Sequence, residues 1–273
     1  METAMDIQAF EHMCIYILSG ILGLCVGSFL NVVIYRLPNN MSLASPGSHC
    51  TSCQYSLRWY DNIPVLSYLI LGGKCRKCKR RISPRYMIVE LINGLLWVLS
   101  AVLFWEKSPV YAVSNAVVSS ALICIFFIDL EHMLIFNRFT LIVALGGIVT
   151  MFISGSTVWY DHLIGAAAGG VVFLGLYFGA VAILKKEGLG FGDVKYAAAA
   201  GLLLGWQKFI LAMLLASVAA AIVMSLLNRI QKTGKQTEHP FGPYLAAGTL
   251  VAMFAGDAII SWYIGLLMKI VMI

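Results

Sequence analysis

Charge is scarce in this sequence. Aspartate, glutamate, lysine and arginine together make up 12% of the 273 residues, against about a quarter in an average soluble domain. Apolar residues make up 60%. This balance excludes an ordinary water-soluble globular protein, and it predicts an integral membrane protein.

Two further patterns are missing. The chain has no clear internal repeat and no low-complexity tract. It also has no glycine-rich loop of the kind that follows a strand in dinucleotide-binding folds. Neither a repeat architecture nor a nucleotide fold of that kind is therefore expected.

The apolar residues are gathered in runs that each approach the ~20 residues needed to cross a bilayer as a helix. They predict an all-α polytopic membrane protein of about eight transmembrane helices. Small-residue pairs such as Gly165/Gly169 and Gly175/Gly179 suggest close helix packing. The predicted runs are 13–35, 87–105, 109–128, 137–155, 163–184, 194–206, 209–227 and 241–268.

Most of the 19 lysines and arginines fall in the predicted loops on one side, above all in residues 36–86. Loops rich in lysine and arginine stay in the cytoplasm, so this side is expected to be cytoplasmic, with both termini on the other. Basic loops beside lipid need no nucleic-acid partner. We therefore expect these basic residues to contact membrane lipid, and we expect no nucleic-acid partner.

Residues 36–86, called the insert below, are long enough to form a small cytoplasmic domain. They carry four cysteines as two CxxC pairs, the spacing of two knuckles that close one tetrahedral zinc site. Two disulfides are the alternative, but cytosolic thiols stay reduced. We expect a structural zinc site, and a division into a first transmembrane helix (1–35), the zinc-binding insert and a membrane domain (87–273). The expected ligands are Cys50, Cys53, Cys75 and Cys78.

Carboxylates within spanning segments are costly and indicate function. Asp129 ends the third predicted helix on the cytoplasmic side, and Asp193 begins the sixth on the same side. Two carboxylates at close range do not both ionise easily, so one keeps a proton. The charged one can then deprotonate water while the other donates to a carbonyl oxygen. The pair predicts a membrane aspartyl protease.

Several neighbours are expected to support this pair. Gly190 and Gly192 allow unusual backbone conformations and a close approach, while Lys195 lies in the same stretch but would point away from Asp193 along a helix. Glu90, about one turn into the second predicted helix, is expected to play a supporting polar role. Asp193 could instead simply cap the start of its helix.

The sequence resembles the type IV prepilin leader peptidases, bifunctional aspartyl proteases of pilus and type II secretion systems, along nearly its whole length. The resemblance implies cleavage of a basic leader after a glycine at the cytoplasmic face of the bacterial inner membrane. It also implies methylation of the new N-terminal amine with S-adenosylmethionine, attributed to the insert, and a catalytic pair at Asp129 and Asp193. It rests on GSFLNVVIYRLP (27–38), DNIPVLSYLILGGKCRKC (61–78), ISPRY (82–86), FID (127–129), GLGFGDVK (188–195) and PFGPYLAAG (240–248).

The sequence departs from the family pattern at a few positions. Asn137 stands where a second acid is usual, and Met87 where proline is common. Two other functions share features with this sequence. Another glycine-aspartate membrane protease, such as a preflagellin peptidase, shares the acid pair but generally lacks the cysteines. A proton-coupled transporter usually places its acids near the midplane of repeated helices.

Overall fold

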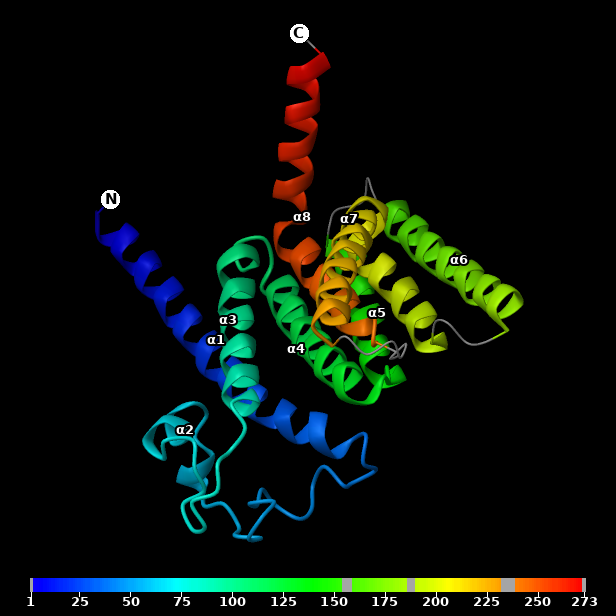
Figure 1. The fold of residues 1–273 in the computed structure, drawn as a ribbon. Helices are drawn as coiled ribbons and strands as arrows, with labels where there is room; N and C mark the ends of the chain where they lie inside the picture. Colours follow the sequence, from blue (N-terminus) through cyan, green and yellow to red (C-terminus); the bar gives the residue numbers. More distant parts are fainter. Residues whose placement is uncertain (1, 154–158, 186–189, 232–238, 272–273) are drawn as a thin grey trace. The chain divides into compact units, whose positions relative to one another are not determined.

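The computed structural model describes residues 2–153, 159–185, 190–231 and 239–271. Most of them are helical, as predicted (Figure 1). The helices are α1 (Glu2–Arg36), the 3-10 helix η1 (Trp59–Asn62), α2 (Leu66–Ile70), α3 (Arg85–Phe104), α4 (Pro109–His132), α5 (Asn137–Ile153), α6 (Trp159–Leu184), α7 (Phe191–Gln231) and α8 (Gly242–Val271).

Six of the described helices are long and apolar enough to cross a membrane: α1, α3, α4, α6, α7 and α8. Helix α5 is a shorter apolar helix. Many large apolar side chains on these helices are exposed in the isolated chain, which a soluble protein would bury but a bilayer accommodates. The chain is a multi-pass membrane protein.

Helix α7 is two helices in sequence. Gly205 inside it has φ 74° and ψ 167°, which is not a helical conformation. Tyr196, in the first half, donates to Thr249, and Ala212, in the second half, lies against Gly248. On a straight helix Tyr196 and Ala212 would be about 24 Å apart, yet both contact the same turn of α8.

The chain therefore reverses direction near Gly205 (Figure 1). Counting the two halves of α7 separately gives eight apolar helical segments among the described residues. This agrees with the eight runs read from the sequence, where 194–206 and 209–227 were predicted as separate helices. The reversal point falls at a glycine because this φ and ψ are accessible essentially only to glycine.

The chain divides into two compact units, residues 1–124 and 125–273. In the first, α1 and α3 pack closely along a row of glycines. A side chain at Gly23 would meet the backbone of Gly94 at 2.9 Å, and one at Gly27 would meet the Glu90 Cα at 2.8 Å. The buried Asn93 side chain donates to the Gly23 carbonyl at 2.6 Å. Small residues let the backbones approach, and the amide fixes the crossing.

In the second unit, α6 crosses α7 with backbone against backbone. A side chain at Gly165 would overlap the Gly201 carbonyl, and one at Gly169 would overlap the Ala197 carbonyl. The Gly165/Gly169 pair thus packs as predicted. The Gly175/Gly179 prediction was wrong, because a side chain at either position would meet nothing within 4 Å in the described part of the chain.

The insert has little regular structure beyond η1 and α2. Two isolated β-bridges, His49 with Ser56 and Lys74 with Arg81, close two short hairpins. A segment with so small a core needs another source of stability, such as a metal or a buried ion pair.

Candidate active site and metal centre

The four cysteines of the insert converge. Their sulfur atoms all lie within 4.8 Å of one another, and no other such group of metal-binding side chains occurs among the described residues. Cys50 and Cys78 Sγ are 3.8 Å apart, and Cys53 and Cys75 Sγ are 3.9 Å apart. A tetrahedron with Zn–S bonds of about 2.3 Å has edges of about 3.8 Å. The cysteine cluster can therefore hold a metal ion of this kind.

Both CxxC pairs have the same backbone form. In the first hairpin Cys50 N–H donates to Tyr55 O, and Gln54 N–H donates back to Cys50 O; Cys75 and Lys79 repeat this bonding in the second. Gln54 and Lys79 each have a left-handed φ, 57° and 59°. These turns direct both sulfurs of a pair toward one point.

Backbone donors favour a thiolate in this cluster. The N–H groups of Cys53 and Ser52 lower the pKa of the Cys50 thiol to about 6. At Cys53 the Tyr55 N–H acts in the same direction, but burial and the neighbouring thiols outweigh it and raise the pKa to about 11. A divalent cation binds cysteine as the thiolate, so a bound ion would favour the deprotonated form of these thiols.

A buried ion pair joins the second knuckle to η1. The Asp61 carboxylate, whose side chain is fully buried, accepts from Arg76 Nε at 2.6 Å and from Arg58 N and the Tyr55 hydroxyl at 3.3 Å. Burial alone would raise the pKa of Asp61, but the Arg76 and Arg58 hydrogen bonds outweigh it and hold the pKa below its usual range. Asp61 thus ties together the parts of the insert that surround the cysteines.

Asp129 lies near the end of α4 and is 5% exposed. The backbone N–H of Gly242, the first residue of α8, donates toward its carboxylate. A side chain at Gly242 would come within 2.5 Å of Asp129 Oδ2. The start of α8 and the end of α4 therefore touch at the carboxylate itself, a contact that only glycine permits.

Asp193 is the third residue of α7. Its Oδ2 accepts from Gly190 N–H at 3.2 Å, and its own N–H donates to Gly190 O at 3.0 Å. This is the reach of a helix cap, one of the two roles that the sequence left open. The charge of Asp129 also acts on this carboxylate. The pairing of the two acids in catalysis stays a prediction.

The glycines of the GLGFGDVK stretch meet one of the two expectations. A side chain at Gly192 would lie 3.1 Å from Ile135 Cβ, so a close approach exists there. Neither Gly190 nor Gly192 is among the described glycines with a left-handed φ. Gly188 lies outside the described residues.

Lys195 is exposed, with its ammonium donating to Asn137 Oδ1 at 3.1 Å and lying 5.0 Å from the centre of the Phe191 ring. It is thus joined to the start of α5. The neutral Asn137 serves as the acceptor at the position where the sequence lacks a second acid.

Glu90 belongs to the first unit, and both aspartates belong to the second. Its Oε2 accepts the Val65 N–H at 2.8 Å, and the Ser28 hydroxyl lies within hydrogen-bonding range. Val65 has φ 60°, an unfavourable value for a β-branched residue. Glu90 therefore holds a strained part of the insert against α1 and α3, a contact the sequence could not indicate.

Gly242 was missed as a site residue. The sequence placed it only within the PFGPYLAAG stretch, and nothing in its local pattern pairs it with Asp129. Only the tertiary contact between α4 and α8 brings Gly242 to Asp129, and the local sequence does not reveal that contact.

Comparison with known proteins identifies the family. The family model for the bacterial peptidase A24 N-terminal domain matches residues 21–104, and that for the type IV leader peptidase family matches residues 116–225. The chain belongs to the type IV leader peptidase family.

Curated relatives extend the match to nearly the full chain. The prepilin leader peptidase/N-methyltransferase of Aeromonas salmonicida is 35% identical over 270 residues, covering 89% of this chain and 92% of that protein. The Pseudomonas aeruginosa protein of the same name is 32% identical over 284 residues, covering 95% and 97%. The Escherichia coli type 4 prepilin-like proteins leader peptide-processing enzyme is 35% identical over 257 residues, covering 87% and 93%. No solved structure matches the chain.

Proposed function

We propose that this protein cleaves the basic leader peptide of type IV prepilins or type II secretion pseudopilins after a glycine, and then methylates the new N-terminal amine. The observation that carries the proposal is that Asp129, at the end of α4, and Asp193, at the start of α7, lie within electrostatic range of each other. The chain also belongs to the leader peptidase family. The names of its curated relatives support both activities.

The proposed cleavage uses the two carboxylates as one unit. The ionised carboxylate takes a proton from water as the water oxygen attacks the scissile carbonyl carbon. The protonated carboxyl donates its proton to the carbonyl oxygen. When the tetrahedral intermediate collapses, the C–N bond breaks and the leaving amine takes a proton from the carboxyl that was protonated by water. The other carboxylate takes back a proton from a hydroxyl of the intermediate, so the dyad again holds one proton.

Gly242 has a proposed positioning role. Its N–H donates toward Asp129, while the Gly190 N–H binds Asp193. Each carboxylate is thus held by a backbone donor from a helix start. Fixed donors of this kind keep reacting groups in place without a reorganisation cost during the reaction.

We propose zinc as the metal of the cysteine cluster and S-adenosylmethionine as the methyl donor. Cys50, Cys53, Cys75 and Cys78 would hold the zinc, and their sulfur spacing fits it. Its role would be to shape the insert, because four sulfurs leave no open position for catalysis. The donor supplies an electrophilic methyl group.

The proposed location is the bacterial inner membrane, with the aspartates facing the cytoplasm. The basic insert supports this orientation through the charge rule for loops. We assign proteolysis to residues 87–273, and methyl transfer to the insert, residues 36–86.

The test is to replace each aspartate by asparagine in the full chain and to measure cleavage of a prepilin by mass. Asparagine keeps the shape but cannot exchange the proton, so Asp129→Asn and Asp193→Asn should each lose cleavage by orders of magnitude. The double variant should be scarcely worse, since residues that act as a unit are not additive. Lys195→Ala, which changes a group bonded to Asn137, should be much milder.

Methylation of an already cleaved pilin should survive both aspartate changes, because that step needs no dyad. This readout also reports on folding. Near-normal cleavage by Asp193→Asn would refute the proposed mechanism.

A further inference from the structure

The short helix α2 carries an exposed apolar face. Leu66, Leu69 and Ile70 are 56%, 60% and 79% exposed. Their spacing of three and four residues places them on one side of the helix. The surrounding segment 65–73, with the sequence VLSYLILGG, contains no charged side chain. Apolar side chains that gather in this way mark a surface that meets a protein partner or a membrane.

The start of α2 lies beside the membrane-spanning part of α3. Val65 N–H donates to Glu90 Oε2 at 2.8 Å. Glu90 is the sixth residue of α3, about 7.5 Å along the helix from Arg85 at its start. The 20 residues of α3 span about 30 Å, which is the thickness of the hydrocarbon core. Because α3 has no residues to spare, a contact at Glu90 lies below the bilayer surface.

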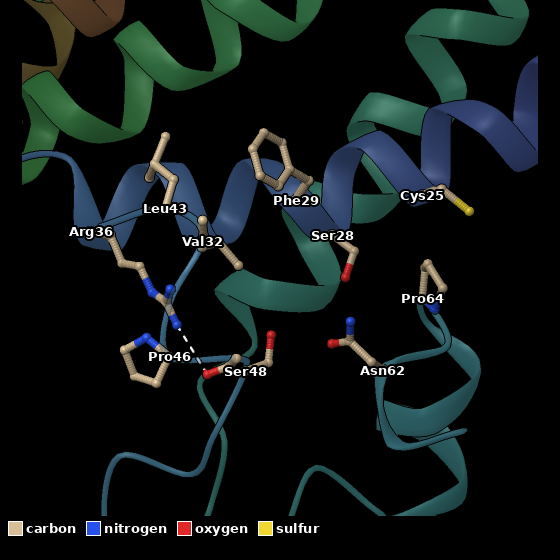
Figure 2. A pocket seen from close by; sticks show the side chains of 12 residues that line it. Cys25, Ser28, Phe29, Val32, Arg36, Leu43, Pro46, Ser48, Asn62 and Pro64 are labelled. Atoms are coloured by element: carbon tan, nitrogen blue, oxygen red, sulfur yellow. Dashed lines mark hydrogen bonds between the residues drawn. The ribbon is translucent and has the colours of Figure 1, made fainter. Parts of the chain in front are cut away.

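The loop that leads into α2 also lies against α1. Asn62 and Pro64 line a cavity of about 390 Å³ together with Cys25 and Ser28 of α1. Figure 2 shows Pro64 at the Cys25 end of this cavity and the buried Arg36, the last residue of α1, at the other. Cys25 lies 11 residues before Arg36, or about 16 Å along the helix. The loop thus reaches a level inside the span of α1 as well.

The backbone of this segment is bonded within the protein. Val65 N–H, just before the first turn of α2, donates to the buried Glu90. The Ser67 hydroxyl donates to the Ile63 carbonyl at 2.8 Å. Further N–H groups donate to carbonyls of residues 63–69, and these donors are Leu66, Ser67, Leu69, Leu71, Gly72 and Gly73. A segment in hydrocarbon has to satisfy its backbone within the protein, whereas a loop in water has no need of a buried acid for one N–H.

The chain becomes basic directly after this segment. Asp61 is the only acid in residues 36–86, and it is paired with Arg76 at 2.6 Å. The exposed basic residues of the second hairpin are Lys74, Lys77, Lys79, Arg80 and Arg81. Basic residues next to a membrane-inserted apolar face are attracted to anionic phospholipid headgroups. The charge of this hairpin therefore complements a lipid surface.

We propose that α2 inserts Leu66, Leu69 and Ile70 into the bilayer leaflet on the side of the insert, with the basic residues of the second hairpin at anionic phospholipid headgroups. A protein partner would have to enter the same leaflet beside α3 to cover this face, whereas lipid is already there. Residues 65–73 then belong to the membrane, and Glu90 shields the N–H of Val65 from hydrocarbon. The inference goes beyond the proposed function, because it needs neither cleavage nor methylation.

The test places p-benzoylphenylalanine, whose ring forms a bond to nearby C–H carbons on irradiation, at position 70 of the metal-loaded full chain. The chain is reconstituted into nanodiscs with equal amounts of phosphatidylcholine and phosphatidylglycerol, and the adduct is identified by mass. Position 66 is a second site on the same face. Each variant is taken forward once it elutes as the wild type does.

Two matched positions bracket the result. Leu95, in the middle of α3, is 68% exposed, and Thr51 is exposed in the first hairpin, outside the apolar face. Position 70 should give lipid adduct within about twofold of position 95, and at least about fivefold more than position 51, because acyl chains surround it. A yield at positions 66 and 70 no higher than at position 51 would refute the insertion of α2.

The headgroup contact is read from the same adducts. Phosphatidylglycerol should be enriched at least about twofold over phosphatidylcholine at position 70, since basic residues favour anionic lipid. The double change Lys74→Gln and Lys77→Gln should reduce this enrichment, whereas Lys107→Gln, beyond the far end of α3, should not. Equal yields of the two lipids with all basic residues intact would contradict the headgroup contact.

Other occupants of the face would give other adducts. Prepilin added to the nanodiscs should leave the lipid adduct at position 70 unchanged. If the adduct instead becomes one with prepilin, or is one with a second copy of the chain, the face is a protein-docking surface and the proposal is overturned.

Discussion

Adding one methyl group at Gly242 should selectively damage cleavage. The Cβ of Gly242→Ala would stand 2.5 Å from Asp129 Oδ2 and 2.7 Å from its Cγ, whereas ordinary contact begins at 3.4 Å. The carboxylate or the start of α8 must therefore move by about 1 Å. A misplacement of about 1 Å can cost about 100-fold in rate, or about 2.7 kcal/mol in the activation barrier.

The same helix provides a matched control. A Cβ added at Gly265 would meet nothing within 4 Å, so Gly265→Ala makes the same chemical change in open space. It should leave cleavage unchanged.

The assay follows cleavage of a prepilin by mass for both variants, with methylation of an already cleaved pilin measured beside it. Gly242→Ala should lose about 100-fold in kcat/KM for cleavage and keep methylation. Wild-type cleavage by a folded Gly242→Ala, or an equal loss in Gly265→Ala, would refute the argument that this contact positions Asp129.

The further predictions concern the insert and the turn of α7. Elemental analysis should find one zinc per chain, lost in Cys78→Ser; a zinc-free wild type with two disulfides would contradict the metal assignment. Asp61→Asn should weaken the insert by about 1.5–3 kcal/mol, seen as zinc release at lower chelator concentration. Folding lowers the pKa of Asp61, so the pairing of Asp61 with Arg76 should stabilise the insert fully above about pH 3.9. This stabilisation should be lost as the pH falls through the pKa of the folded state, which zinc release to a chelator measured across pH 3–7 would reveal. Gly205→Ala should cost about 1–3 kcal/mol and lower the melting temperature, while Gly175→Ala should not.

The helices could be predicted because length and hydropathy are local properties. The sequence predicts the break in α7, because it places two separate apolar runs at 194–206 and 209–227. It lies at Gly205 because the required φ of 74° decides the position. The cysteine cluster could also be predicted from the sequence, because the two-residue spacing within each CxxC pair is typical of a metal-binding knuckle.

The sequence could not indicate which backbone donors meet the aspartates, because those contacts depend on how helices distant in sequence cross. Arg36 shows a second limit. In the sequence it is one more basic residue in a positively charged loop, where it counts toward orientation. Its burial follows from the 42–47 segment folding back over the end of α1, which no periodicity encodes.

The insert also joins the cysteine cluster, through one closed stretch of chain, to a cavity of about 390 Å³ that residues of α1 and of the insert line (Figure 2). Asn62 and Pro64 of the cavity wall lie between the two knuckles, within the loop that a metal bridging Cys50 and Cys78 would close. A metal there would restrict that loop without touching the cavity, much as a crosslink does. Metal occupancy and the affinity of the cavity for a ligand would then be thermodynamically linked, each raising the other by the same factor. Metal supply would thereby set how much of such a ligand the protein holds at a given concentration.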